Sequence, residues 1–151
     1  MIEADFNRRV NDKLDSKKIR SWKVIDDFQG GVPDNYYHRR DAPENNEYVK
    51  PLFIEYKLIK KLPKRSTTKI VPKCSALQID WLKELHDNNS EPWVIVGYAG
   101  KTPARGVIYS YEETIVGITA AEFEQRLQSY AELGRKIEQR LGLDSISPIL
   151  Q

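Results

Sequence analysis

Three charged side chains stand where they could share one metal ion. Asp34 closes a Gly-Val-Pro-Asp run, and Glu55 and Lys57 flank Tyr56 inside an apolar stretch. Because successive side chains of a strand point to opposite faces, a strand here places Glu55 and Lys57 on one face, about 7 Å apart. If the segment after Asp34 pairs with that strand, both carboxylates and the ammonium group meet in one small site.

Two carboxylates beside an ammonium group suit a hard divalent cation. Mg²⁺ takes oxygen ligands, commonly one or two carboxylates together with phosphate oxygens and water. Such an ion lowers the pKa of bound water and neutralises charge that develops on a phosphate, and a lysine can orient the water or stabilise the transition state. The sequence therefore predicts a Mg²⁺ site, with Mn²⁺ as an alternative ion, held by Asp34 and Glu55 and by the carbonyl of Ile54 or Tyr56.

The elements that must position these residues follow from the hydrophobic pattern. Leu52, Ile54, Tyr56 and Leu58 form the apolar face of a central strand, opposite Glu55 and Lys57. The pattern predicts strands over 21–28, 34–38, 52–59, 93–99 and 105–111, and helices over 3–19, from 75 onward and over 119–141. The run over 93–99 is almost continuously apolar, as in a strand buried on both faces. We expect an α/β fold with a mixed sheet of about five strands flanked by helices.

The helix that begins at Ser75 carries a residue with two alternative roles. Ser75 and Gln78 have the spacing of a capping box, in which the glutamine side chain returns to the serine amide. Alternatively, Gln78 points toward the charged residues and holds a water or a phosphate. The apolar face of this helix is expected to consist of Leu77, Trp81, Leu82 and Leu85, and Trp81 is interpreted as core rather than as a base-stacking platform.

Together these motifs resemble the PD-(D/E)XK nuclease superfamily, and within it the VRR-type and phage junction-resolving nucleases. The resemblance spans residues 3–85 and depends on Gly31 to Asp34, Glu55 to Lys57, Ser75, Gln78, Trp81 and Leu82. It implies a restriction-endonuclease-like core and a Mg²⁺-dependent endodeoxyribonuclease. The expected substrate is branched DNA such as a Holliday junction, in phage-type recombination or replication. Cutting two strands of a junction calls for two active sites, hence a homodimer.

Three further residues are candidates for the margin of the site. The resemblance implies a glutamate on the first helix that points at the metal, which is Glu3 here, with Asp5 as a nearby competitor. Either acidic residue would also be favourable near a helix N-terminus without any catalytic role. His38 would share a face with Asp34, although a lone histidine is more often a surface or packed residue.

The segment between Tyr56 and Ile79 is basic and contains no acidic residue. Such asymmetry is typical of a surface that binds a polyanion, and the alternative is a solvated loop. We expect a long, flexible loop that contacts the DNA backbone through Lys60, Lys61, Lys64, Arg65, Lys69 and Lys73.

Composition sets the remaining bounds. At 151 residues, with a net charge of +2 and a single cysteine, the chain is expected to form one domain over 1–151, with a frayed tail over 143–151. No apolar run approaches a membrane span, and the N-terminus does not resemble a signal peptide, so a cytoplasmic protein is expected, in the host if the chain is phage-encoded.

Two other readings of the same residues stay open from the sequence. The chain could be a DNA-binding module on an inactive nuclease fold, which needs the basic segment but not the three charged residues. It could also be a structural protein in which Glu55 and Lys57 form an exposed ion pair far from Asp34, a pair worth little to stability.

Overall fold

The computed structural model describes residues 1–24, 30–41 and 48–143. A five-stranded sheet runs through it in the order β1-β2-β3-β5-β6. Its strands are β1 (Ile19–Lys23), β2 (Asn35–Arg39), β3 (Leu52–Ile59), β5 (Trp93–Tyr98) and β6 (Arg105–Tyr109). Strands β3 and β5 are parallel and the other neighbours are antiparallel. The predicted mixed sheet of about five strands is confirmed.

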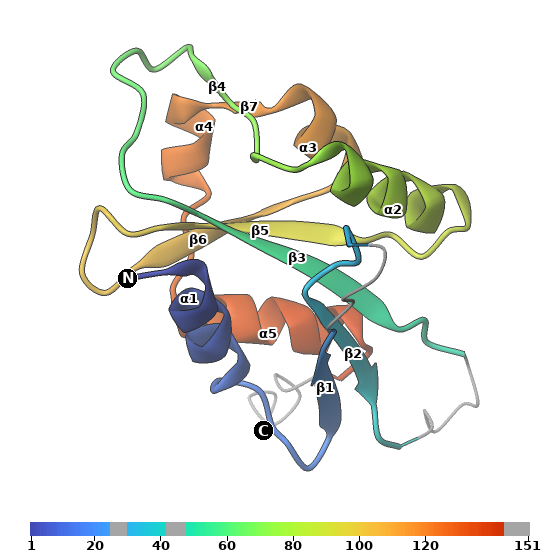
Figure 1. Ribbon diagram of the computed structural model, residues 1–151. Helices are drawn as coiled ribbons and strands as arrows, with labels where there is room; N and C mark the ends of the chain where they lie inside the picture. Colours follow the sequence, from blue (N-terminus) through green and yellow to red (C-terminus); the bar gives the residue numbers. More distant parts are fainter. Residues whose placement is uncertain (25–29, 42–47, 144–151) are drawn as a thin grey trace.

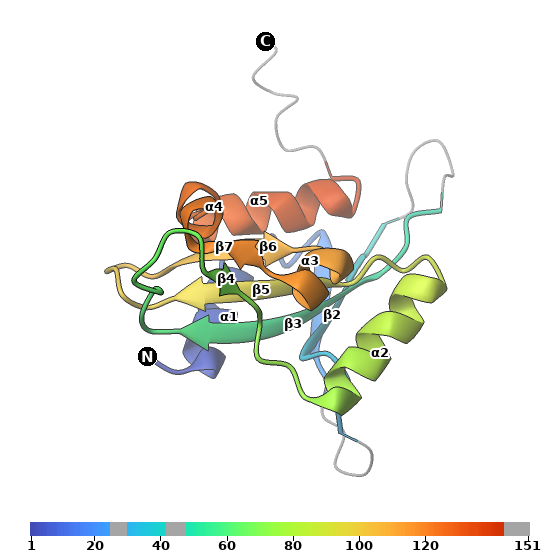
Figure 2. The same cartoon turned by 90° about the horizontal axis from the view of Figure 1, so that it is seen from above.

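Helices lie on both faces of this sheet (Figure 1, Figure 2). One face carries α1 (Glu3–Asn11) and α5 (Tyr130–Arg140), and the other carries α2 (Ala76–Asp87), α3 (Tyr111–Val116) and α4 (Ala120–Gln125). Each face has its own hydrophobic cluster, and β5 contributes to both, with Ile95 in one and Val94 and Val96 in the other. The prediction that this strand is buried on both faces is confirmed.

The first helix is shorter than predicted, and the first strand begins earlier. Helix α1 ends at Asn11, and Ile19 belongs to β1, where it pairs with Arg39. The Asp15 carboxylate accepts a hydrogen bond from the Lys17 amide at 2.9 Å and so supports a turn between the two elements. The helical spacing of apolar residues continued across this turn and concealed it. The end of the predicted strand over 21–28 lies outside the described residues.

The predicted helix over 119–141 is two helices. Between α4 and α5, Gln128 forms an isolated bridge with Gly106 of β6, and Ser129 then caps α5 by accepting from the Glu132 amide. Phe123 of α4 packs in the cluster with β6, whereas Leu133 of α5 packs in the cluster of the opposite face. A single straight helix cannot bury its residues on two faces of one sheet, so the chain breaks between them.

Three short elements were not predicted, namely α3, β4 (Lys69–Ile70) and β7 (Ile118–Thr119), the last two of which pair with each other. Of the predicted frayed tail only Leu143 is described, and it packs against the core. Within the described ranges, no helix has the length and apolar character that a membrane crossing requires.

Candidate active site

The candidate site lies where β3 loses its neighbour. Strand β2 pairs with β3 only over Leu52–Ile54, and beyond Ile54 no described strand pairs with β3 on that side. Beyond Ile54, side-chain carboxylates accept the hydrogen bonds of the β3 backbone amides. The Tyr56 amide donates to Asp34 Oδ2 at 2.8 Å, and the Leu58 amide donates to Glu3 Oε2 at 3.3 Å. Two of the predicted carboxylates therefore bind the backbone of the strand that carries the third.

Glu55, Lys57 and Gln78 form a hydrogen-bonded group beside this edge. Lys57 Nζ lies 3.4 Å from Glu55 Oε2 and 2.9 Å from Gln78 Oε1. Gln78 Nε2 donates to Glu55 Oε2 at 3.0 Å. The Glu55 and Lys57 side chains are 3% and 14% exposed, and Asp34 bonds to the residue between them, so the reading as an exposed pair far from Asp34 is wrong.

Gln78 serves the cap and the charged group at once. Its Oε1 accepts from the Ser75 amide at 2.9 Å, and its own amide donates to Ser75 Oγ at 3.1 Å. The same Oε1 accepts from Lys57, and the Nε2 group remains for Glu55. The sequence analysis gave these two roles as alternatives. The side-chain carboxamide of Gln78 has separate donor and acceptor atoms, which allows both roles at once.

The loop before Asp34 packs tightly on the start of α2. Gly31 has a φ of 78°, and a Cβ at this position would lie 2.6 Å from the Leu77 carbonyl carbon. Only glycine fits there, both for its backbone conformation and for the close approach. This contact fixes the distance between Asp34 and the helix that presents Gln78. The Leu77 side chain is 53% exposed, so its predicted place on the apolar face is wrong, whereas the predicted burial of Leu82 is confirmed.

Glu55 is the most unusual group of the site. The residue is 2% exposed, and Oε1 is buried without a hydrogen-bond partner in the described structure. Burial raises the pKa of Glu55 to about 8, the negative charge of Asp34 adds to the rise, and Lys57 opposes it. A buried carboxylate beside a second carboxylate is stabilised in its charged form by a nearby cation.

These residues fit a Mg²⁺ site, although the described part of the chain holds no group of three or more His, Cys, Asp or Glu side chains arranged for a metal. Mg²⁺ needs only one or two carboxylates. The Glu55 atom Oε1 has a free lone pair, and the Asp34 carboxylate lies beside it. The carbonyl of Tyr56 faces the same edge as its amide, because both groups of a strand residue point to one side.

The three marginal candidates are placed differently. The Glu3 carboxylate lies against β3, whereas Asp5 lies 3.7 Å from Arg8 in an exposed ion pair. Burial raises the pKa of Cys74 to about 11; Lys57 opposes the rise, and the carboxylates of Glu55, Asp34 and Glu3 add to it. Glu3 thus contacts the strand that carries Glu55 and Lys57. No hydrogen bond joins His38 to any of these residues, and its ring packs on Tyr36.

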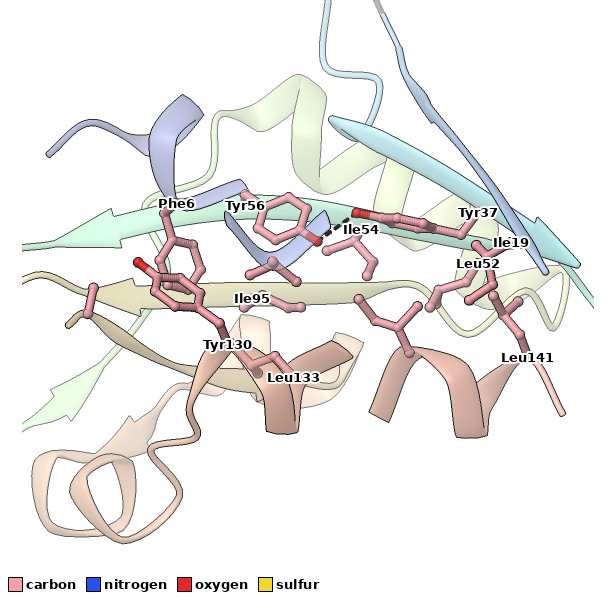
Figure 3. Packing of buried hydrophobic residues seen from close by; sticks show 13 residues of the cluster. Phe6, Ile19, Tyr37, Leu52, Ile54, Tyr56, Ile95, Tyr130, Leu133 and Leu141 are labelled. Atoms are coloured by element: carbon pink, nitrogen blue, oxygen red, sulfur yellow. Dashed lines mark hydrogen bonds between the residues drawn. The ribbon is translucent and has the colours of Figure 1, made fainter. Parts of the chain in front are cut away.

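A buried polar network lies under the site, on the opposite face of the sheet. The hydroxyl groups of Tyr56 and Tyr37 are 2.7 Å apart (Figure 3), and Tyr37 also donates to Asn11 Oδ1 at 2.6 Å. Asn11 donates to Asn7, which in turn donates to Asn35. The network ties α1 and β2 to β3, which are the elements that hold the carboxylates. Tyrosines in an apolar pattern gave no sign of it in the sequence.

The basic segment is exposed but more ordered than predicted. All six predicted DNA-contacting side chains are exposed. Lys69 lies in β4, and the carbonyls of Ser66 and Thr68 accept from the Ala121 and Ala120 amides at the start of α4. Lys60 lines a cleft with Arg9 and Lys101, two cations that the sequence did not single out because they are distant in the chain.

No protein-family model matches this sequence, and no curated protein matches it either. Among solved structures, the chain is similar to Hjc, a Holliday junction resolvase from the archaeal hyperthermophile Archaeoglobus fulgidus. The two share 17% sequence identity at a TM-score of 0.49, over 88% of this chain and 98% of that one. A similarity at this level carries no argument about the function of this chain.

Proposed function

We propose that this chain is a metal-dependent endonuclease that hydrolyses phosphodiester bonds in branched DNA. The observation that supports it is Glu55, which is buried next to Asp34 with one carboxylate oxygen unpaired. Placing the charged form of Glu55 in a buried position beside Asp34 costs stability, and the Lys57 contact does not remove that cost. An arrangement that opposes folding in this way is typical of functional sites.

The residues at the free edge of β3 divide the work. Asp34, Glu55 and the Tyr56 carbonyl would hold Mg²⁺ or Mn²⁺, and the bound ion would supply positive charge for the phosphate and a lower pKa for a water ligand. Lys57 is held at the margin of the site by Glu55 and Gln78, where its ammonium group can orient the attacking water and stabilise developing negative charge. Gln78 fixes the orientation of both side chains.

The exposed cations provide the contact with the DNA backbone. The basic segment follows the C-terminal end of the strand that carries Glu55 and Lys57. Its exposed cations are Lys60, Lys61, Lys64, Arg65, Lys69 and Lys73. Binding through such contacts weakens steeply with salt. The preference for four-way junctions, phage-type recombination and the homodimer follow from the resemblance of the sequence motifs and belong to the same proposal.

Plasmid nicking tests the proposal. The wild-type protein should nick supercoiled DNA with Mg²⁺ and should stop when EDTA is added. Glu55→Ala and Lys57→Ala should each lower the rate roughly a hundredfold or more, while DNA binding stays nearly unchanged. Glu124→Ala, at an exposed carboxylate of α4, is the matched control and should cleave normally.

Two outcomes would count against this assignment. Equal loss of binding and cleavage in Glu55→Ala would mean that this residue is not catalytic. Tight DNA binding without nicking, with either ion, would support the inactive DNA-binding module instead. A panel of linear, nicked, flapped and four-way DNA then tests the substrate, and the proposal predicts the fastest cleavage on the four-way form.

A further inference from the structure

Aromatic side chains continue the sheet face that carries the site. Trp22 of β1 packs on Tyr36 of β2 with ring centroids 5.8 Å apart, and Tyr36 packs on Phe53 of β3 at 5.1 Å. His38 packs on Tyr36 at 5.4 Å. The pairs Trp22–Tyr36 and Tyr36–Phe53 are in register across the strands, so the rings share one face of the sheet. We call Trp22, Tyr36, His38 and Phe53 the aromatic face.

The aromatic face takes no part in the hydrophobic core of the described structure. None of its members belongs to either hydrophobic cluster. The helices on this side of the sheet bury residues of β5 and β6 and leave β1 and β2 without a covering helix (Figure 1). Trp22 is 56% exposed, and the other three rings are partly exposed. Exposed rings packed on one another, outside the core, indicate a binding surface.

The aromatic face begins next to the proposed metal ligands. Phe53 lies two residues before Glu55 on β3, and Tyr36 lies two residues after Asp34. Each carboxylate therefore has an aromatic ring about 7 Å along its own chain, on the same face. A phosphate held at the two carboxylates through the proposed metal ion would place its neighbouring nucleotide over these rings.

The charges around the aromatic face favour a nucleic acid as its occupant. On β1 the exposed Arg20 shares a face with Trp22, whereas Lys23 points to the opposite face, and no acidic residue occurs between Ser16 and Val24. Arg20 pairs in register with His38 and forms no ion pair with a described residue. Aromatic rings beside unpaired cations are typical of surfaces on which bases stack while the backbone is neutralised.

We infer that the aromatic face stacks unpaired bases beside the scissile phosphate. The site would then take DNA whose strands separate at the cleavage point, in preference to continuous duplex. Bases inside a duplex are already stacked on their neighbours, so their faces reach a protein ring only after unpairing, which costs free energy. The inference deepens the proposed function and rests on it, because it places the scissile phosphate at Asp34 and Glu55.

Binding of a short single-stranded DNA in EDTA tests the stacking without cleavage. Trp22→Ala should bind roughly tenfold more weakly than the wild type, and Trp22→Phe should retain most of the affinity. The slope of affinity against salt should not change, because no phosphate contact is removed. Tyr48→Ala is the matched control, since Tyr48 is 79% exposed and packs on none of the four rings.

A four-way junction that lacks the base next to the scissile phosphate sharpens the test. If Trp22 stacks on that base, the wild type and Trp22→Ala should bind this junction equally, whereas they should differ on the intact junction. Equal affinities of the two proteins for intact and abasic DNA alike would overturn the inference. The inference would also be overturned if Trp22→Ala converted a dimer to a monomer in sedimentation without changing the affinity for DNA. The aromatic face would then bind a second copy of the chain.

Wild-type nicking with Mg²⁺ separates this inference from the proposed function. Nicking with unchanged binding in Trp22→Ala would reject the stacking and leave the nuclease standing. Stacking without nicking by the wild type would reject the nuclease, and the aromatic face would remain a site for unpaired bases.

Discussion

The two edges of strand β3 differ in what completes them. Toward β5, six residues from Ile54 to Ile59 are paired in parallel with Trp93 to Tyr98, and the side chains of β5 fill both hydrophobic clusters. Toward β2, pairing stops at Ile54, and the carboxylates of Asp34 and Glu3 receive the amides that a strand would otherwise bind. The same strand is thus completed by backbone on one edge and by acidic side chains on the other.

The edge of β3 toward β5 therefore contributes mainly to stability, and the edge toward β2 carries the proposed chemistry. On the paired edge, strand pairing and the burial of apolar side chains favour folding. On the other edge, a backbone hydrogen bond holds Asp34 close to Glu55, whose pKa is raised by burial and by the charge of Asp34 and whose Oε1 atom has no hydrogen-bond partner in the described structure. Fixed positions of this kind are what a metal-dependent site requires. Changes at the two edges should therefore have separable effects on activity and on stability.

The largest expected effect is on activity at the open edge. Asp34→Asn keeps an acceptor for the Tyr56 amide but removes one of the two charges proposed to hold the metal. The nicking rate should fall roughly a hundredfold or more, with little change in melting temperature. Asp80→Asn, on the exposed side of α2, serves as the control. A variant that cleaves at a rate near that of the wild type would show that Asp34 is not a ligand.

The paired edge should show the opposite behaviour. Ile95→Ala leaves a cavity between β5 and the helices of one face and should lower the free energy of unfolding by about 2–5 kcal/mol. Cleavage per folded molecule should stay near the wild-type rate, measured below the urea midpoint. Ile115→Ala is the control, because Ile115 is 45% exposed. Loss of cleavage in the folded variant would mean that the two edges are not separable.

Glu55 should also make stability depend on pH. Its pKa is raised from 4.5 to about 8 by burial and by Asp34, so between these values the folded protein binds more protons than the unfolded chain. The free energy of unfolding of the metal-free protein should therefore fall as the pH rises through this window. Glu55→Gln should remove that slope. Parallel melting curves for the two proteins, measured in EDTA across the window, would contradict the assignment.

The smallest effect separates the two roles of Gln78. Ser75→Ala removes the acceptor for the Gln78 amide and should destabilise the protein by about 1 kcal/mol. The Gln78 side chain keeps its contacts with Glu55 and Lys57, so cleavage should not change. Gln78→Ala should lose both the cap and the rate. If Ser75→Ala slowed cleavage as much as Gln78→Ala, the cap itself would be what positions the site.

The sequence predicted best where local alternation decides the structure. The two faces of β3 and the double burial of β5 follow from period two and from a continuous apolar run. The pattern failed where a distant partner decides. Nothing local shows that Gln128 bridges to Gly106 and separates two helices, or that α1 ends before Leu14 although the apolar spacing continues.

The surroundings of the candidate site were harder to predict than its central residues. The resemblance predicted Asp34, Glu55, Lys57, Gln78 and Glu3 as one group. In the structure, Glu55 and Lys57 lie on β3 and the other three side chains bond to residues of that strand. The tyrosine and asparagine network and the aromatic face were missed, because each joins residues from separate strands or helices. Recognising either one requires the register of β1, β2 and β3, which the sequence alone does not specify.

Diffraction from crystals soaked in Mn²⁺ would test the central claim most directly. The account predicts an anomalous scattering peak between the carboxylates of Asp34 and Glu55, at the open edge of β3, and no such peak in Glu55→Gln. A peak elsewhere in the molecule, or no peak between these carboxylates at saturating Mn²⁺, would contradict it.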